Sequence, residues 1–284
     1  MRRKLAKRVA IGAAVVGGGL LLARSSQGSR SHHDHVDATY PPLDVPKPIA
    51  PDVWIVDSGP INAGGIEMPL RMSVIRLASG DLLLHSPTRF SPELRDALQA
   101  LGCIAHIVAP NIAHWMYVEE WQRAVPDATA WAAPGLRDRG QVRRSRVRFD
   151  HDLGDTAPPA WADEIEQGVI PGGFGFREVF LFHKPSRTLL LTDVAQNFDP
   201  AKLPPLTRAL MQVAGATNER AAVYLRAVVK LGGRDAAQAA ARMVALAPER
   251  VVFAHGDWFA DNATARLRHS LGWLLPAEAA PGAL

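Results

Sequence analysis

Short apolar runs with the length of buried β-strands alternate along this chain with segments of helical periodicity, in mixed order and without an internal repeat. Three of these runs stop at side chains that bind metals in many proteins: His114, Asp193 and His255. Mixed strands and helices favour an α/β layered fold over a helix bundle or an all-β sandwich. The 284 residues, 48% of them hydrophobic, supply a core large enough for one domain of catalytic size.

The positive charge of the chain is concentrated at its N-terminus. The formal net charge is +4, but residues 1–30 hold seven Lys or Arg and no acidic residue. The remaining residues have 25 Lys and Arg against 28 Asp and Glu, a net charge of −3. The basic balance therefore belongs to the first residues, and we expect no nucleic-acid partner.

Residues 1–24 have the pattern of a membrane-targeting segment. A basic stretch over residues 1–8 precedes fifteen uncharged residues at 9–23. This run has the length of a signal-peptide core, is shorter than the ~17 to 25 residues of a spanning helix, and is followed by no clear cleavage site. A cleaved signal and a retained anchor both stay open. Positive charge before the run predicts a membrane-anchored or exported protein with its globular part on the non-cytoplasmic side.

Residues 25–50 are rich in Ser, His, Asp and Pro, a composition that predicts a disordered linker. The linker contains His32, His33 and His35, but no apolar strand precedes them to fix them as ligands. We interpret these histidines as solvated. A single domain is expected over residues 51–284.

Periodicity and turn residues predict the elements of this domain. Strands are expected at residues 53–56, 71–77, 82–85, 104–108, 128–132, 143–149, 176–183, 188–192 and 251–254. Helices are expected at residues 91–101, from near 114 to 124, at 134–139 and at 261–274, with a helical segment over 199–247. The helix at 91–101 has the clearest limits, because Ser91 and Pro92 begin it and Gly102 follows it.

Three arginines, Arg144, Arg146 and Arg148, alternate with Ser and Val in the strand expected at 143–149, so they would share one face. We interpret this face as a solvated strand edge that charge protects from pairing with other chains. A surface that binds anions near the site is the alternative.

Several motifs occur in the order that is typical of one superfamily. A strand leads into Ala109-Pro-Asn-Ile-Ala-His-Trp115, a hairpin runs from His183 to Asp193, and a late strand ends in Ala254-His-Gly256. In these features the chain resembles the metallo-β-lactamase-like fold superfamily over roughly residues 50–274, and within it an uncharacterised branch known as a domain of unknown function. The resemblance implies an α/β fold, a four-layer αββα sandwich with mixed sheets.

The H-x-H-x-D-H motif of that superfamily is degenerate in this chain. When the two are matched at the start of the following helix, Ala109, Asn111, Ala113 and His114 stand at the four ligand positions. Gly173 stands where the superfamily usually has a later histidine. The resemblance implies that every ligand exclusive to the first metal is replaced, whereas three of the four second-metal ligands remain.

His114, Asp193 and His255 are therefore the predicted metal ligands and catalytic residues. Two histidines and a carboxylate suffice for one divalent ion, Zn²⁺ before Fe²⁺ or Mn²⁺, and leave positions open for water and substrate. The predicted activity is metal-assisted hydrolysis of a small molecule that the sequence does not identify, with Asp193 orienting the attacking water. A non-catalytic binding or scaffold protein that has lost its metals is the alternative.

Four further side chains are candidates to support the site, with an ordinary polar role as the alternative for His85 and Glu178 and a core or rim position as the favoured alternative for Tyr117. His85 ends an apolar strand that approaches the site in the superfamily, so it is a candidate replacement ligand or base. Asn111 takes the place of a histidine, and Glu178 begins the strand before the hairpin turn. Tyr117 lies three residues after His114, on the same face if that loop is helical.

Overall fold

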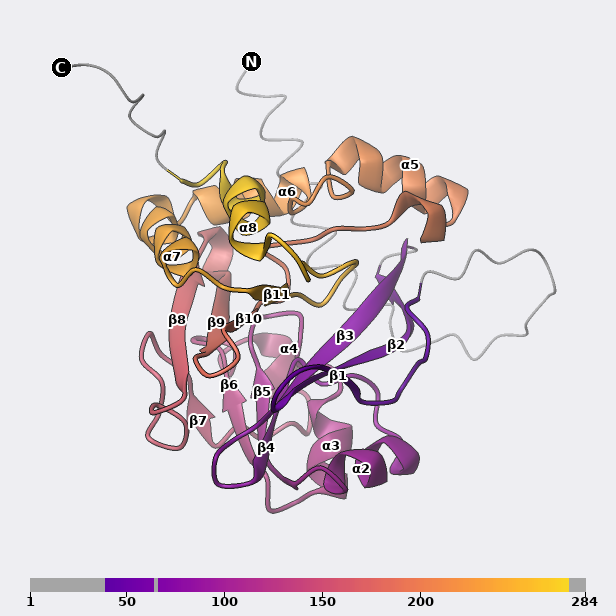
Figure 1. The fold of residues 1–284 in the computed structure, drawn as a ribbon, viewed down its shortest axis with the longest axis vertical. Helices are drawn as coiled ribbons and strands as arrows, with labels where there is room; N and C mark the ends of the chain where they lie inside the picture. Colours follow the sequence, from indigo (N-terminus) through magenta and orange to yellow (C-terminus); the bar gives the residue numbers. More distant parts are fainter. Residues whose placement is uncertain (1–38, 64–65, 276–284) are drawn as a thin grey trace.

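The computed structural model describes residues 39–63 and 66–275, which form two β-sheets packed face to face between helices (Figure 1). The expected membrane-targeting segment, residues 1–24, lies outside the described residues, as do residues 25–38 of the expected linker. Within the described part of the chain, no helix has both the length and the apolar character that are needed to cross a bilayer.

The larger sheet has seven strands in sequence order. Its first four strands are antiparallel neighbours, and from the fourth strand onward the pairing is parallel. Parallel neighbours need a crossover, and helices provide it after the fourth and fifth strands. The elements are β1 (Lys47–Ala50), β2 (Val53–Ala63), β3 (Ile66–Arg76), β4 (Asp81–His85), α2 (Pro92–Gln99), β5 (Cys103–Ala109), α3 (Val118–Ala124), β6 (Thr129–Ala132), α4 (Gly140–Arg143) and β7 (His151–Asp152).

The smaller sheet has four strands in the order β11-β10-β9-β8, and in it only β10 and β11 are parallel. A long helical segment separates β10 from β11 in the sequence, as the sequence predicted for residues 199–247. The elements are β8 (Ile165–Pro171), η1 (Gly173–Gly175), β9 (Arg177–His183), β10 (Thr188–Leu190), η2 (Pro200–Lys202), α5 (Pro205–Ala214), α6 (Val223–Lys230), α7 (Gly233–Ala245), β11 (Arg250–Val252) and α8 (Ala263–Leu271).

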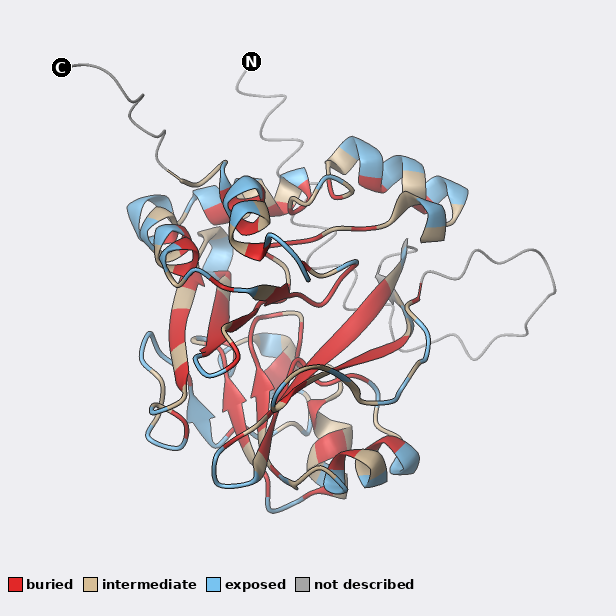
Figure 2. Ribbon diagram, in the orientation of Figure 1, coloured by how far each residue is buried: buried red, intermediate tan, exposed pale blue. Residues whose placement is uncertain are grey.

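Apolar clusters fill the spaces between four layers. One cluster lies between the larger sheet and helices α2 and α3, a second between the two sheets, and a third between the smaller sheet and helices α6, α7 and α8. Figure 2 shows that the strands are mostly buried and that the helices expose their outer sides. The mixed sheets and the helical layers confirm the αββα sandwich that the resemblance implied.

The folded domain begins before residue 51, where the sequence predicted its N-terminal limit. Residues 47–50, which composition placed in the linker, form β1 and pair with β2 at the edge of the larger sheet. This strand is short and contains Pro48, which an edge strand tolerates. Composition does not reveal such a strand, because its hydrogen-bond partners come from another part of the chain.

Residues 133–149 also differ from the prediction. Residues 134–139 form turns instead of a helix, and residues 143–149 form no strand. The backbone of Arg148 is held by the side chain of Gln122 in α3, which accepts from its N–H at 3.2 Å and donates to its carbonyl. The strand prediction is wrong because β7 already occupies the edge beside β6.

A buried arginine in β3 ties the larger sheet to the end of the smaller one. The guanidinium of Arg71 pairs with the carboxylate of Asp57 at 2.6 Å, and both side chains are 3% exposed. It also donates to the backbone carbonyls of Phe253, at 3.2 Å, and Gly256, at 2.7 Å. One side chain thus fixes the loop after β11 against β3.

We predict that Arg71→Leu costs about 2–4 kcal/mol of the free energy of unfolding, because the buried Asp57 carboxylate then keeps only Lys47 as an ionic partner and two backbone carbonyls lose their donor. Arg76→Leu in the same strand is the control. Arg76 pairs with Asp52 where both side chains are about two-fifths exposed, so its loss should cost at most about 1 kcal/mol. Urea denaturation of the two variants measures the difference, and equal losses would contradict the prediction.

Candidate metal centre

Strands from both sheets end at one edge of the sandwich, and the three predicted ligands follow them. β5 leads into the loop that carries His114, while β10 and β11 lead to Asp193 and His255. Backbone bonding continues past the paired ends of β10 and β11, where the N–H of Ala254 donates to the carbonyl of Thr192 at 3.3 Å. Because these two strands are parallel, the residues that follow them lie side by side.

The coordinating atoms of His114, Asp193 and His255 all lie within 4.8 Å of one another. The Nε2 atoms of His114 and His255 are each 3.4 Å from an oxygen of Asp193, one on Oδ2 and the other on Oδ1. Both histidines are buried and Asp193 is partly buried. The spacing suits three ligands that each reach one ion at ~2.0 to 2.2 Å.

Hydrogen bonds on the far side of each imidazole decide which nitrogen faces the carboxylate. Nδ1 of His255 is 2.7 Å from the carbonyl of Pro69, which only accepts, so Nδ1 carries a proton. Nδ1 of His114 is 2.7 Å from Oγ of Ser86, whose hydroxyl donates to the carbonyl of Arg71 at 3.5 Å. The Pro69 carbonyl therefore fixes the tautomer of His255, and the Ser86 hydroxyl engages Nδ1 of His114, so both rings turn Nε2 toward Asp193.

The carboxylate of Asp193 lies between the two imidazoles, where it can accept a hydrogen bond from Nε2 or share a cation with it. Burial by itself would raise the pKa of Asp193, but the charges and hydrogen bonds of His114 and His255 outweigh it and hold the pKa well below its usual range. The donor set fits a divalent metal, because it supplies two imidazole nitrogens and an ionised carboxylate.

Asn111 positions two of the three ligands. Its Nδ2 atom donates to Oδ2 of Asp193 at 2.6 Å and to Oγ1 of Thr192 at 2.9 Å. Its Oδ1 atom accepts from the backbone N–H groups of Ala113, at 2.8 Å, and His114, at 3.0 Å. Asn111, which stands at a histidine position of the superfamily motif, therefore hydrogen-bonds to the side chain of Asp193 and to the backbone of His114.

Glu178 holds the backbone beneath Asp193. Its buried carboxylate accepts from the N–H groups of Thr192, at 2.7 Å, and Asp193, at 2.9 Å, and from Asn111 at 3.3 Å. Burial raises the pKa of Glu178, and the negative charge of Asp193 adds to that effect. The carboxylate that begins β9 thus fixes where the end of β10 presents its ligand.

Gly256 sets the direction of the chain directly after His255. Its φ is +95°, a conformation that side chains rarely adopt, and a Cβ atom there would lie 2.0 Å from the carbonyl oxygen of Asn197. Asn197 and Gly256 form a β-bridge between the two ligand loops. The glycine lets the loops that carry Asp193 and His255 approach closely.

The residues that the resemblance matched to the first metal's ligands include Ala109 and Gly173, which carry no donor side chain. A Cβ atom on Gly173 would lie 2.5 Å from a methyl group of Leu231, the residue that follows α6, so a side chain at this position would have to displace Leu231. Ala109 is fully buried in the core. In the part of the chain that the structure describes, His114, Asp193 and His255 form the one cluster able to hold a metal.

Tyr117 lies in the core, the alternative that the sequence favoured for it, and not on a helical face shared with His114. Residues 111–117 form turns and α3 begins only at Val118, so the condition for a shared helical face is not met. Tyr117 packs, partly buried, against the cluster beneath α2 and α3. His183 ends β9, at the opposite end of the strand from Glu178, and its ring bonds to Ser186 in the hairpin turn at 2.7 Å.

Two residues near the ligands gave no signal in the sequence. Ser86 bonds to His114 but follows β4 as an ordinary polar residue, and its φ of +59° is visible only in the structure. Tyr224 lies in α6, where burial, followed by the negative charge of Asp193, raises its pKa to about 12. Its position in a helix far along the chain does not predict that it lies near enough to Asp193 to be affected by its charge.

The family of the chain follows from its match to a family model. A model described as a domain of unknown function (DUF4336) matches residues 52–232. The chain belongs to this family. Comparison with curated proteins found no match. Membership of DUF4336 agrees with the degenerate motif but assigns no reaction.

Solved structures place this DUF4336 chain among metallo-β-lactamase folds. A metallo-β-lactamase from Pontibacter korlensis is 15% identical, with a TM-score of 0.50 over 81% of this chain and 97% of that one. The DIM-1 metallo-β-lactamase is 13% identical, with a TM-score of 0.55 over 83% and 97%. FIM-1 from Pseudomonas aeruginosa, in its mono-zinc form, is 12% identical, with a TM-score of 0.52 over 79% and 94%. At these identities the likeness shows the fold.

We predict that Glu178→Leu destabilises the protein, because it leaves the N–H groups of Thr192 and Asp193 buried without acceptors. Each unsatisfied group costs about 1–3 kcal/mol. Glu166→Leu, in the neighbouring strand β8, removes a partly exposed pairing with Arg242 and serves as the control, with a loss of at most about 1 kcal/mol. Thermal and urea unfolding measure both, and a Glu178→Leu protein as stable as the control would contradict the role of Glu178.

His85 generates a prediction about pH. It is buried beside the site, and burial, followed by the positive charge of His114, lowers its pKa to about 3. The pKa of an unperturbed histidine is about 6.5, so between pH 6.5 and pH 3 the unfolded chain binds a proton at His85 and the folded chain does not. The free energy of unfolding therefore loses nothing to His85 above about pH 6.5, and it decreases as the pH falls from 6.5 toward 3.

Denaturation at a series of pH values tests this expectation with His85→Gln, which keeps a polar side chain and removes the titration. The variant should lose less of its free energy of unfolding between pH 6.5 and pH 4 than the unchanged protein does. Parallel curves for the two proteins would show that His85 is not held neutral.

Proposed function

We propose that this chain binds one divalent metal ion through His114, Asp193 and His255 and uses it to hydrolyse a small molecule. The observation that carries the proposal is the orientation of the two imidazoles. Each has its Nδ1 atom engaged by the protein and directs Nε2 to the same carboxylate. Zn²⁺ suits this set best, and Fe²⁺ or Mn²⁺ also accept it.

The residues around the ligands have separate tasks in this proposal. A divalent ion held there supplies a Lewis acid that polarises a carbonyl or phosphoryl oxygen and acidifies water. Asp193 stays ionised, with Oδ2 held by Asn111 and Oδ1 facing His255, so it can accept a hydrogen bond from water and orient it toward substrate. Asn111 and Glu178 keep that carboxylate in place.

The fold supports a site for one metal. FIM-1, which shares the fold at 12% identity, is described in a mono-zinc form, so this architecture holds a lone zinc in that protein. In this chain Leu231 fills the space next to Gly173, and the remaining cluster offers three ligands. One ion is therefore the number that the described residues favour.

A non-catalytic binding or scaffold protein is the second candidate. It is favoured by the replacement of superfamily ligands at Ala109, Asn111, Ala113 and Gly173. In that case Asn111, His114 and Asp193 would be a buried polar network that stabilises the fold without metal. Metal content separates the two candidates directly.

The test is elemental analysis of the full chain purified without chelator. We predict about one equivalent of Zn, Fe or Mn per chain, and its loss in Asp193→Ala. A chelator should lower the melting temperature of the unchanged protein and leave that of Asp193→Ala unaffected, because only a metal-binding fold gains stability from the ion.

Two control variants keep the result specific. His269 is exposed on α8, so His269→Ala should retain the metal. Replacement of His32, His33 and His35 by alanine removes the histidines outside the described residues and should also leave the metal in place. Metal lost with those three histidines and kept in Asp193→Ala would overturn the proposed site, and a metal-free protein would support the scaffold function.

A further inference from the structure

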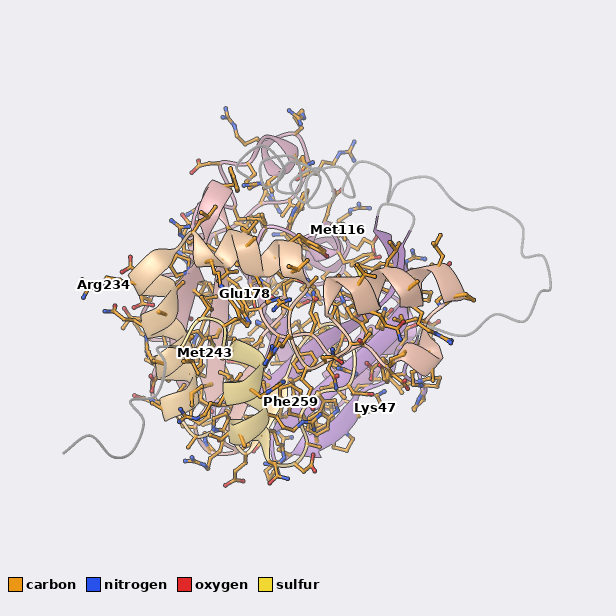
Figure 3. All side chains as sticks on the ribbon, turned by 90° about the horizontal axis from the view of Figure 1, so that it is seen from above. Lys47, Met116, Glu178, Arg234, Met243 and Phe259 are labelled. Carbon is orange, nitrogen blue, oxygen red and sulfur yellow. The ribbon has the colours of Figure 1, made fainter. Side chains whose placement is uncertain are left out.

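Large apolar side chains are exposed mainly on one part of the molecule. Of the seven that the described residues expose, six lie on α5, α6 and the adjoining turn η1. We call this the α5–α6 face and define it by Phe174, Leu206, Leu210, Val213, Val223 and Leu231. Figure 3 looks down on these helices, which cover this end of the molecule.

Helix α5 presents an apolar stripe to solvent. Leu206, Leu210 and Val213 follow the spacing of one helix face and are 73%, 45% and 88% exposed. The opposite face is buried through Thr207 and Met211, which pack on the domain. The helix therefore exposes an apolar surface in addition to the face that it buries on the domain. Exposed apolar surfaces of this kind are typical of interaction sites.

Basic side chains surround this apolar surface. Residues 200–234 contain six Lys or Arg and a single acidic residue, Glu219, which pairs with Arg266 at 2.9 Å. Among the described residues Arg220 and Arg226 form no ion pair with an acidic side chain, and both residues are partly exposed. Apolar side chains between unpaired cations match the chemistry of an anionic lipid surface.

The chain enters the described domain at the same end. Lys202, directly before α5, donates to the carbonyl of Thr39 at 3.3 Å, and its ammonium group lies 4.7 Å from the ring centre of Tyr40. Residues 24–38 separate this point from the apolar run at 9–23 and span at most about 50 Å. A leader held in a bilayer would therefore tether the domain by its α5 end.

We propose that the α5–α6 face docks on an anionic lipid bilayer, the same membrane to which residues 1–24 direct the chain. Leu206, Leu210 and Val213 enter the interface between headgroups and acyl chains, while Arg220 and Arg226 pair with lipid phosphates. The proposal is independent of the metal centre, because none of these side chains is a ligand.

Site-specific fluorescence of the full chain in vesicles tests the proposal. Cys103 is the only cysteine, so Cys103→Ser allows a single label at Val213→Cys or, as control, at Asp96→Cys on α2. α2 and α5 lie at opposite ends of the molecule (Figure 1). The emission wavelength of an environment-sensitive fluorophore shortens when the label leaves water. Lipids with brominated acyl chains quench its emission on contact.

In vesicles of phosphatidylcholine with phosphatidylglycerol we expect the Val213 label to shift to shorter wavelength and to be quenched, while the Asp96 label stays in water. Arg220→Glu with Arg226→Glu should weaken the shift, as should vesicles of phosphatidylcholine alone or high salt. Both labels remaining in water on vesicle-bound protein would overturn the proposal. A shift without vesicles that grows with protein concentration would also overturn it, in favour of a second copy of the chain.

Discussion

The packing of the two sheets against each other is the constraint on which the candidate site depends. Apolar side chains from the larger sheet, such as Ile75 and Val108, meet those of the smaller sheet, such as Leu181 and Val252, and exclude water between them. This contact fixes the positions, relative to one another, of strands that belong to different halves of the sequence. The loops after β5, β10 and β11 consequently open at one edge and present their polar residues to one another.

Polar groups buried at that edge are held by a connected network. Asp193 is stabilised as an anion by the two histidines, while Glu178 and Asn111 satisfy the backbone and side-chain groups around it. Arg71 joins the network to Asp57 and to the loop after His255. A buried network of this kind is stable only when its members find partners, so a change at one member is expected to affect the others.

Helix α6 connects the two proposals. Leu225 and Val229 on its inner face pack on the smaller sheet. Burial raises the pKa of Tyr224, on the same helix, and the negative charge of Asp193 adds to that effect. Its outer face carries Val223 and Arg226 in the proposed lipid contact. One helix would thus lie between the metal centre and the membrane, which would place hydrolysis close to a lipid surface.

Local sequence determined much of the architecture. Ser91 caps α2 by accepting from the N–H of Leu94 at 3.1 Å, as its position before Pro92 predicted. Apolar periodicity located the strands that end near His114, Asp193 and His255 because a buried strand needs an uninterrupted apolar run wherever it lies. The superfamily resemblance implied the sandwich, and the solved structures confirm it.

Tertiary structure decided what local pattern does not encode. β1 exists because β2 offers an edge, residues 143–149 form a loop because β7 has taken the position beside β6, and Tyr117 faces the core because its segment forms turns. The sequence by itself determined which residues could serve as ligands, since that depends on side-chain chemistry. Only the folded chain decided that they converge, which atoms face inward and that Leu231 fills the space beside Gly173, because these depend on contacts between residues far apart in the sequence.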